Sequence, residues 1–315
     1  MSADVALLVV SLAGLTIAGD QFVVGVARLA SVLRIRPTIV GAVVGGIGTS
    51  LPELLVSGVA TARGELQLAV GNLVGSIIAN ISLGLGIAAM VAPIRVDSIA
   101  IRREAPISVG SVLLFGLLTR STPSANTGVV FSLALVAALV LLLLNARIVP
   151  VRDELAVEVV DFFGEPRRHR TGREVARTLL SMAGMLVAAE VLVRSGADLA
   201  SRLGVGQGLV GLTLVAIGTS APLIASNVQA ARRGDHDLVV GNTVGGNLFI
   251  ALGGGLVVGF LSEGSGPGIG VAPLWLMAAL ALGSWGFMAR GTRVSRWEAM
   301  LLLLTYAAAL PFVAR

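Results

Sequence analysis

Two stretches of this chain carry nearly the same residues, and they decide the fold. Residues 41–57 read GAVVGGIGTSLPELLVS and residues 211–226 read GLTLVAIGTSAPLIAS. Displacing the sequence by 170 residues aligns both Ile-Gly-Thr-Ser segments and aligns Pro52 with Pro222, without a gap. Further matches at this displacement extend from Ser11 with Ser181 to Gly75 with Gly245. A long similarity at one fixed displacement indicates an internal repeat.

The composition around these stretches is that of a membrane protein. The chain has 315 residues, of which 55% are hydrophobic and 13% charged, and its mean hydropathy is +0.92. Soluble domains carry about 25% charged residues, so this chain has too few polar groups for a water-facing surface. The net charge of +5 comes from arginines in short segments between apolar runs. That placement favours membrane topology over nucleic-acid binding.

The apolar runs are long enough to cross a bilayer, which takes about 20 residues for each helix. We therefore predict an all-α polytopic protein with ten transmembrane helices. The expected spans are 4–27, 37–62, 67–93, 104–120, 126–147, 175–194, 207–231, 237–261, 271–289 and 296–313.

The repeat divides these spans into two halves of five. Because five is odd, the second half must enter the membrane upside down relative to the first. Inverted repeats are typical of secondary transporters, with the substrate site at the bilayer midplane where the repeats meet. The predicted units are a first repeat at 1–147 with its motif at 41–86, a linker at 148–174, and a second repeat at 175–315 with its motif at 211–255.

Arginines are distributed unevenly between the two sides of this topology. Alternate connections carry 17 arginines on one side and five on the other, with Arg177 left out as ambiguous. The arginine-rich side is expected in the cytoplasm, which places both termini outside the cell membrane.

The repeated motifs carry oxygen ligands at membrane depth. Proline within a span frees a backbone carbonyl, and we expect the broken helix to line a cavity. Carbonyls together with Thr and Ser hydroxyls suit a hard cation such as sodium or calcium. Glu53 follows Pro52 deep in the second span, where a carboxylate is costly and so indicates function. Asn80, on the third span, could supply an amide oxygen.

These motifs resemble the two α-repeats of sodium/calcium exchangers. The first resemblance rests on GTSLPEL at 48–54 and GNLVGS at 71–76, and the second on GTSAP at 218–222 and GNTVGGN at 241–247. The resemblance covers essentially the whole chain. It implies a cation antiporter in which the first and sixth spans rock across a core of spans two, three, seven and eight. The ion-binding residues that it implies are Thr49, Ser50, Glu53, Ser76, Asn80, Thr219 and Ser220, with Glu53 and Asn80 as metal ligands.

The second repeat departs from the family pattern at its acidic position. Leu223 stands where the family has a second Glu, Gly246 replaces a Ser, and Ile250 replaces an Asn or Asp. In the first repeat, Ile77 stands where the family usually has Asn. One buried carboxylate balances one monovalent cation or one proton, whereas a calcium site usually has several carboxylates.

We therefore expect an exchanger of inorganic cations in the lipid bilayer, with sodium/proton or another monovalent exchange favoured over sodium/calcium exchange. The alternative is a degenerate, non-transporting homologue with a structural or sensing role. An enzyme is disfavoured because Glu53 has no second deep acid or base beside it. No cofactor or nucleic-acid partner is expected. Asp20 and Glu190 are interpreted as packing or interfacial residues, and His169 and His236 receive no role.

Overall fold

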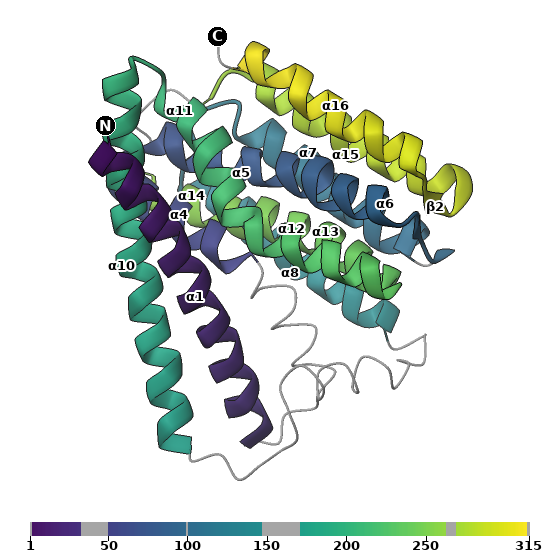
Figure 1. Cartoon of the computed structure of the whole chain (residues 1–315), viewed down its shortest axis with the longest axis horizontal. Helices are drawn as coiled ribbons and strands as arrows, with labels where there is room; N and C mark the ends of the chain where they lie inside the picture. The colour runs from purple at the N-terminus through teal and green to yellow at the C-terminus, as the bar shows by residue number, and fades with distance from the viewer. Residues whose placement is uncertain (1, 33–49, 99, 147–170, 263–268, 314–315) are drawn as a thin grey trace.

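The computed structural model describes residues 2–32, 50–98, 100–146, 171–262 and 269–313. In these residues the fold is helical apart from one short strand pair, and each of the ten expected spans has a helical counterpart (Figure 1). Seven of the described helices are long and apolar enough to cross a membrane, and the helix at Leu51–Ala62 is a shorter apolar one. The all-α polytopic fold is therefore confirmed.

The helices of the first half follow the expected spans in the described residues, and residues 37–49 of the second expected span lie outside them. They are α1 (Ser2–Val32), α4 (Leu51–Ala62), α5 (Leu66–Ala79) continuing through the π-helical turn η2 (Asn80–Leu85) into α6 (Gly86–Val91), η3 (Ala100–Glu104) leading into α7 (Ala105–Leu118), and α8 (Ala125–Ala146).

The second half repeats this pattern. Its helices are α10 (Thr171–Leu203), α11 (Gln207–Val210) continuing through η4 (Gly211–Val215) into α12 (Ala216–Arg233), α13 (His236–Phe249) continuing through η5 (Ile250–Gly254) into α14 (Gly255–Leu261), α15 (Val271–Gly291) and α16 (Arg296–Val313). The strands β1 (Ile94–Arg95) and β2 (Arg293–Val294) pair antiparallel.

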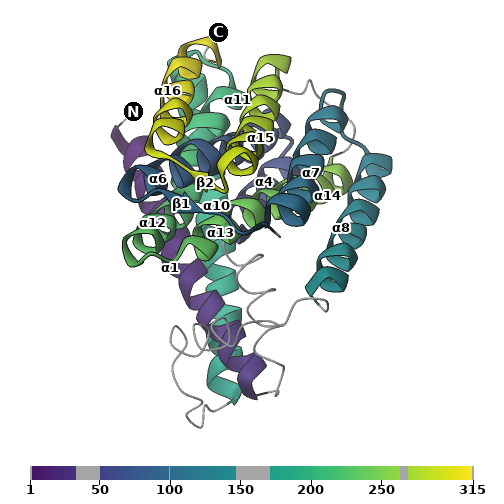
Figure 2. The ribbon, with the colours of Figure 1, turned by 90° about the vertical axis from the view of Figure 1, so that its right-hand side faces the viewer.

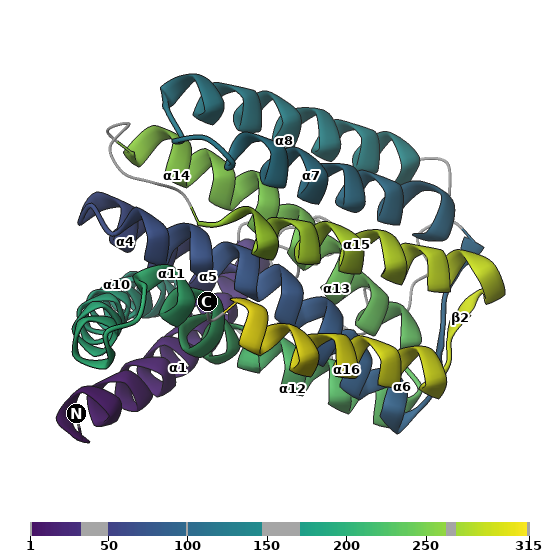
Figure 3. The same cartoon turned by 90° about the horizontal axis from the view of Figure 1, so that it is seen from above.

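The packing reflects the repeat. Helices α1 and α10, which occupy equivalent places in the two halves, lie side by side and extend beyond the other helices (Figures 1 and 2). Helix α8 packs on α14 of the other half, and its counterpart α16 packs on α6 (Figure 3). These two contacts are equivalent with the roles of the halves exchanged, as two repeats related by an approximate two-fold axis require.

Burial separates a central layer from a lipid-facing one. In the most apolar 18-residue window of Leu66–Val91, 78% of the residues are buried, and in that of His236–Leu261, 72% are. In Ala125–Leu142 the share is 17%. The third and eighth spans therefore form the centre of the molecule. The outer helices expose large apolar side chains, such as Leu133 at 66% and Leu180 at 73%, which suits contact with acyl chains.

Glycine allows the two central repeat segments to approach each other backbone to backbone. A Cβ atom added at Gly75 in α5 would overlap the carbonyl oxygen of Leu212 and lie 2.6 Å from Cβ of Ala216. A Cβ atom added at Gly211 would likewise overlap the carbonyl oxygen of Leu68. Small residues permit this close approach between membrane helices.

Replacing Gly75 by alanine is therefore expected to destabilise the fold by about 1–3 kcal/mol, the usual cost of overpacking. The measurement is the midpoint of thermal unfolding in detergent. Gly110→Ala in α7 is the control, because Gly110 is exposed and an added Cβ there meets nothing within 4 Å. A Gly75→Ala protein as stable as the wild type would contradict the close packing of α5 on η4.

Candidate functional site

Glu53 lies in the first turn of α4 and is fully buried, with 0% of its surface exposed. Ser50 forms the N-cap of this helix and Pro52 stands in its first turn, where a missing backbone N–H is tolerated. The hydroxyl of Ser220 in α12 donates to Oε1 of Glu53 at 3.3 Å. The other carboxylate oxygen, Oε2, is buried and has no hydrogen-bond partner among the described residues. A buried polar atom of this kind points to a proton or a cation.

Hydroxyl groups from both halves gather beside this carboxylate. Oγ of Ser76 in α5 lies 3.4 Å from Oγ1 of Thr219 in α12. Thr219 Oγ1 is also 3.2 Å from the carbonyl oxygen of Ala216. The hydroxyls of α12 thus contact both helices of the first repeat: Thr219 meets Ser76 of α5, and Ser220 meets the Glu53 carboxylate of α4.

Asn80 forms a second contact between the repeats. Its amide nitrogen donates to Oδ1 of Asn247 at 3.1 Å, and both side chains are buried. Oδ1 of Asn80 is buried without a partner among the described residues. Asn80 also opens the π-helical turn η2, whose repeat equivalent η5 begins at Ile250. Such turns in membrane-spanning and other helices are frequent at functional sites.

The second repeat is apolar at the positions where the family has its acidic and polar side chains. Leu223 is 1% exposed, and a Cβ atom added to Gly84 or Gly246 would lie only 3.1 or 3.3 Å from its methyl groups. Ile250 is completely buried. The hydroxyl of Ser50 donates to the backbone carbonyl oxygen of Gly246 at 3.3 Å, because Gly246 has no side-chain oxygen. The position of the missing second acid is thus filled by packed hydrocarbon.

The structure brings together six of the seven sequence-predicted residues: Ser50, Glu53, Ser76, Asn80, Thr219 and Ser220. Thr49 lies outside the described residues. The expected break at the second proline is absent, since α12 continues through Pro222. That proline removes one hydrogen-bond donor without interrupting the helix, because a kink or an unpaired carbonyl is tolerated within a packed bundle.

One further residue, Asn72, supports the backbone at Glu53. Asn72 in α5 donates to the backbone carbonyl of Glu53 at 3.2 Å and to Oγ of Ser57 at 3.0 Å. Its own Oδ1 accepts from Thr219 at 3.3 Å. Asn72 therefore ties α4 to α12 through α5. The sequence offered a signal for it, because Asn72 aligns with Asn242, which bonds Asn227 and Ser226 in the same way.

The chemistry available is that of one carboxylate among neutral oxygens. No group of three or more His, Cys, Asp or Glu side chains that could hold a metal ion is found in the described part of the chain. Carboxylate, hydroxyl and amide oxygens are ligands for hard cations. The site is suited to binding a cation or a proton.

Comparison with known proteins identifies the family. The family described as sodium/calcium exchanger protein matches residues 4–147 and 174–314. This chain belongs to the sodium/calcium exchanger family. The match spans both halves and leaves out most of the segment between them, so the resemblance of the repeated motifs is confirmed.

Individual relatives agree with this family. The putative antiporter CaxA of Alkalimonas amylolytica is 36% identical over 232 residues, which cover 73% of this chain and 72% of the relative. The inner membrane protein YrbG of Escherichia coli (strain K12) is 35% identical over 252 residues, covering 78% and 75%. The solved structure of the sodium-calcium exchanger NCX_Mj superposes with a TM-score of 0.63 at 26% identity and covers 98% of each chain.

Membership of the sodium/calcium exchanger family makes the protein a multi-pass membrane transporter and a cation antiporter, as expected, rather than an enzyme. The family match does not depend on the second acidic position, which this member has replaced by Leu223. The residues of its own site therefore determine which ions it carries.

Proposed function

We propose that this exchanger carries a monovalent cation, sodium, in exchange for protons at a single site around Glu53. The observation that supports this most directly is the environment of its carboxylate: Oε1 accepts from Ser220, while Oε2 is buried without a partner among the described residues. One negative charge there is balanced by one sodium ion or by one proton.

The proposed ligands of sodium come from both repeats. The carboxylate of Glu53 supplies the charge, and the hydroxyls of Ser76, Thr219 and Ser220 supply neutral oxygens beside it. Asn80 and Ser50 lie at the neighbouring contact with α13, and Thr49 is retained in the proposal from the sequence. A site shared by two inverted repeats can open to either side when the repeats rock against each other.

Calcium transport is disfavoured by charge. A divalent ion at this site leaves one positive charge uncompensated in a low-dielectric interior, which is expensive. The second-repeat positions where the family has acidic or polar side chains hold Leu223 and Ile250, both buried and without oxygen atoms in their side chains. NCX_Mj is named as a sodium-calcium exchanger. In this chain the residues of the site fit sodium better than calcium.

The proposal is tested in liposomes that contain the purified protein and an outward sodium gradient. Calcium uptake and lumenal pH are recorded together in the same vesicles. A sodium-driven pH change without calcium uptake is the expected result. Calcium uptake at the rate of a two-carboxylate relative would overturn the monovalent assignment. Absence of both fluxes in folded protein would favour the degenerate, non-transporting alternative, which the packed Leu223 also supports.

We propose further that α1 and α10 move together relative to the core during exchange. An ion-pair cluster joins α10 to the end of α4: Nη1 of Arg63 lies 2.5 Å from Oε1 of Glu190, and Nη2 of Arg194 lies 2.6 Å from the same atom. Arg63 and Glu190 each keep 35% of their side-chain surface exposed. A movement of α10 along α4 requires this contact to break.

Replacing Glu190 by glutamine is expected to change the exchange rate by no more than about fivefold. A partly exposed ion pair contributes about 0.2–1 kcal/mol, which corresponds to a small factor in an equilibrium. The initial rate of the sodium-driven pH change measures this, with Arg120→Gln as a control for removal of an exposed charge. Complete loss of exchange in Glu190→Gln would instead identify Glu190 as an ion ligand.

A further inference from the structure

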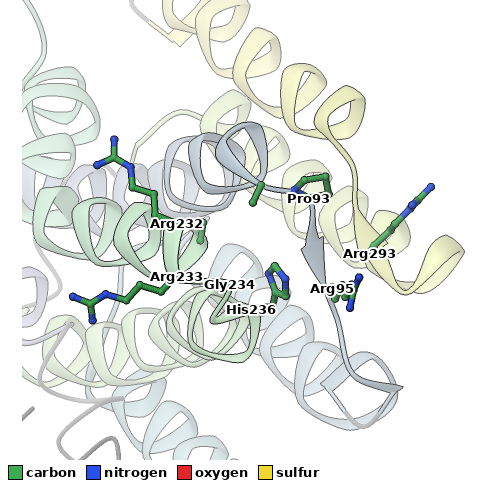
Figure 4. Close-up of a pocket in the computed structure, with 9 residues that line it drawn as sticks. Pro93, Arg95, Arg232, Arg233, Gly234, His236 and Arg293 are labelled. Atoms are coloured by element: carbon green, nitrogen blue, oxygen red, sulfur yellow. The ribbon is translucent and has the colours of Figure 1, made fainter. Parts of the chain in front are cut away.

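A second polar feature lies away from the cation site, where the ends of several spans meet. A cavity of about 550 Å³ is bordered by the segment that follows α6, by the turn between α12 and α13, and by the β1–β2 pair (Figure 4). Arg95, Arg232, Arg233, His236 and Arg293 line it. The four arginines come from three different connections, all of which the charge pattern places on the arginine-rich face.

These arginines lack acidic partners. Within the described ranges, no ion pair joins Arg95, Arg232, Arg233 or Arg293 to a carboxylate. Asp235, which stands next to the cavity, turns its carboxylate to the backbone N–H of Leu238 at 3.4 Å and caps α13. Four arginines without an ion pair in the described ranges thus line the cavity.

The strand pair adds like-charge repulsion. Arg95 and Arg293 are direct partners across β1 and β2, and like charges placed directly opposite each other destabilise a strand pair. In Figure 4 the side chains of Arg232 and Arg233 extend to one side and that of Arg293 to the other, each away from His236. An anion bound among them would relieve this repulsion.

His236 provides a buried polar atom at the same place. Its Nδ1 is inaccessible to solvent and has no hydrogen-bond partner among the described residues. His236 is also the first residue of α13, and the N-terminus of a helix favours negative charge. An imidazole with its proton on Nδ1 can donate to an anionic oxygen. The cavity therefore combines four arginines with an imidazole nitrogen that lacks a partner among the described residues, and a ligand reaches this nitrogen when the imidazole turns toward the cavity.

The depth of the cavity identifies the source of the anion. The apolar spans end at Val91 and Arg233, and the next begins at His236, so the cavity lies where hydrocarbon gives way to lipid headgroups. Met90, beside it, exposes 39% of its surface, which provides an apolar flank for an acyl chain. Basic pockets between membrane helices on the arginine-rich face are suited to lipid headgroups.

We propose that this cavity binds the phosphate group of an anionic phospholipid. The phosphate oxygens accept from His236 and from the arginines of the rim, which can swing inward on their flexible side chains, and the acyl chains lie along the α6 side. Bound there, the lipid bridges the first repeat at Pro93 and Arg95 to the second at Arg233 and His236. This proposal concerns a different site from the cation site and does not depend on which ions are exchanged.

The test compares the purified full-length protein in phosphatidylcholine with the same protein in mixtures that contain phosphatidylglycerol. Native mass spectrometry counts the retained lipids, and thermal unfolding measures their effect on stability. We expect retention of phosphatidylglycerol over phosphatidylcholine and a higher unfolding midpoint. The Arg95→Gln/Arg233→Gln protein should retain phosphatidylglycerol at least fivefold more weakly, while Arg120→Gln, which removes an arginine assigned to the opposite face, should retain it as the wild type does.

A single substitution separates binding from a purely structural role. Arg293→Gln removes the repulsion with Arg95, so its unfolding midpoint in phosphatidylcholine should equal or exceed that of the wild type. The increase in unfolding midpoint that phosphatidylglycerol produces should be less than half of the increase in the wild type. Equal stabilisation of all variants by phosphatidylglycerol would overturn the proposal. Displacement of the lipid by millimolar inorganic phosphate would also overturn it, because the site would then be one for a free anion.

Discussion

Replacing Glu53 by glutamine is expected to lower sodium-driven exchange by about two to four orders of magnitude. Removing one partner of a buried charge pair costs about 3–5 kcal/mol, because the bound cation is left uncompensated, and each 1.4 kcal/mol is a factor of ten in binding. Glutamine keeps the size of the side chain and an oxygen that can accept from Ser220. The loss should therefore appear in transport, with the fold preserved.

Proteoliposomes that carry wild type and Glu53→Gln at equal protein density provide the measurement, read as the initial rate of the lumenal pH change. Asp20→Asn is the matched control, since Asp20 is an acid in the span α1 that faces outward from the bundle. It should retain most of the wild-type rate. Retention of exchange by Glu53→Gln, with unchanged thermal unfolding, would remove Glu53 from the mechanism and with it the single-carboxylate site.

Much of this architecture was predictable from the sequence because lipid imposes simple rules. A span needs a long apolar run, so all ten expected spans have helical counterparts. The displacement of 170 residues also predicted that the repeated motifs meet at the centre. There, Glu53 contacts Ser220 and Asn80 contacts Asn247.

The detailed pairing was not predictable from the repeat alone. Matching by displacement pairs Asn80 with Ile250, yet the hydrogen bond goes to Asn247, the equivalent of Ile77. Glu53 likewise bonds Ser220, the equivalent of Ser50, rather than contacting its own counterpart. Because the repeats run in opposite directions, a residue meets the equivalent of its neighbour one helical turn earlier. This offset depends on where the two-fold axis lies, which the spacing of motifs does not specify.

Other features follow only from contacts between residues that are far apart in the sequence. The arginines that line the cavity belong to three separate connections, and the β1–β2 pair places Arg95 opposite Arg293. Arg177, which the charge pattern left unassigned, lies 3.4 Å from a carboxylate oxygen of Glu174. The same acid lies 3.8 Å from Arg28 of the arginine-rich set, which places Arg177 with that set. A sequence shows the sign of these charges but not which of them meet.

Replacing Leu223 by glutamate is expected to create calcium transport, the second large effect. Leu223 packs against Gly84 and Gly246, and Gly246 in turn lies against Ser50 and Asn80, so a carboxylate at this position joins the same group of side chains. Two carboxylates balance a divalent ion, which removes the charge penalty that disfavours calcium in the wild type. Leu223→Glu should take up calcium at least ten times faster than the wild type under an outward sodium gradient.

Leu223→Gln is the control for this change, because it introduces a polar side chain of the same shape without charge. It should show no gain in calcium uptake. A folded Leu223→Glu protein that transports sodium and protons as before, with no calcium uptake, would mean that residue 223 lies outside the ion path. The selectivity would then have a cause other than the number of carboxylates.

The doubly substituted protein, Glu53→Gln with Leu223→Glu, separates charge number from charge position. It carries one carboxylate, as the wild type does, but on the second repeat. Calcium uptake should disappear again, because one negative charge remains. Monovalent exchange should recover only in part, because Gly246 stands at the repeat equivalent of Ser76, whose hydroxyl lies 3.4 Å from that of Thr219 in the wild-type site. Full recovery would show that exchange requires only one carboxylate, in either repeat. Partial recovery would show that exchange also requires the hydroxyls near Glu53, so that a carboxylate in the first repeat is more effective than one in the second.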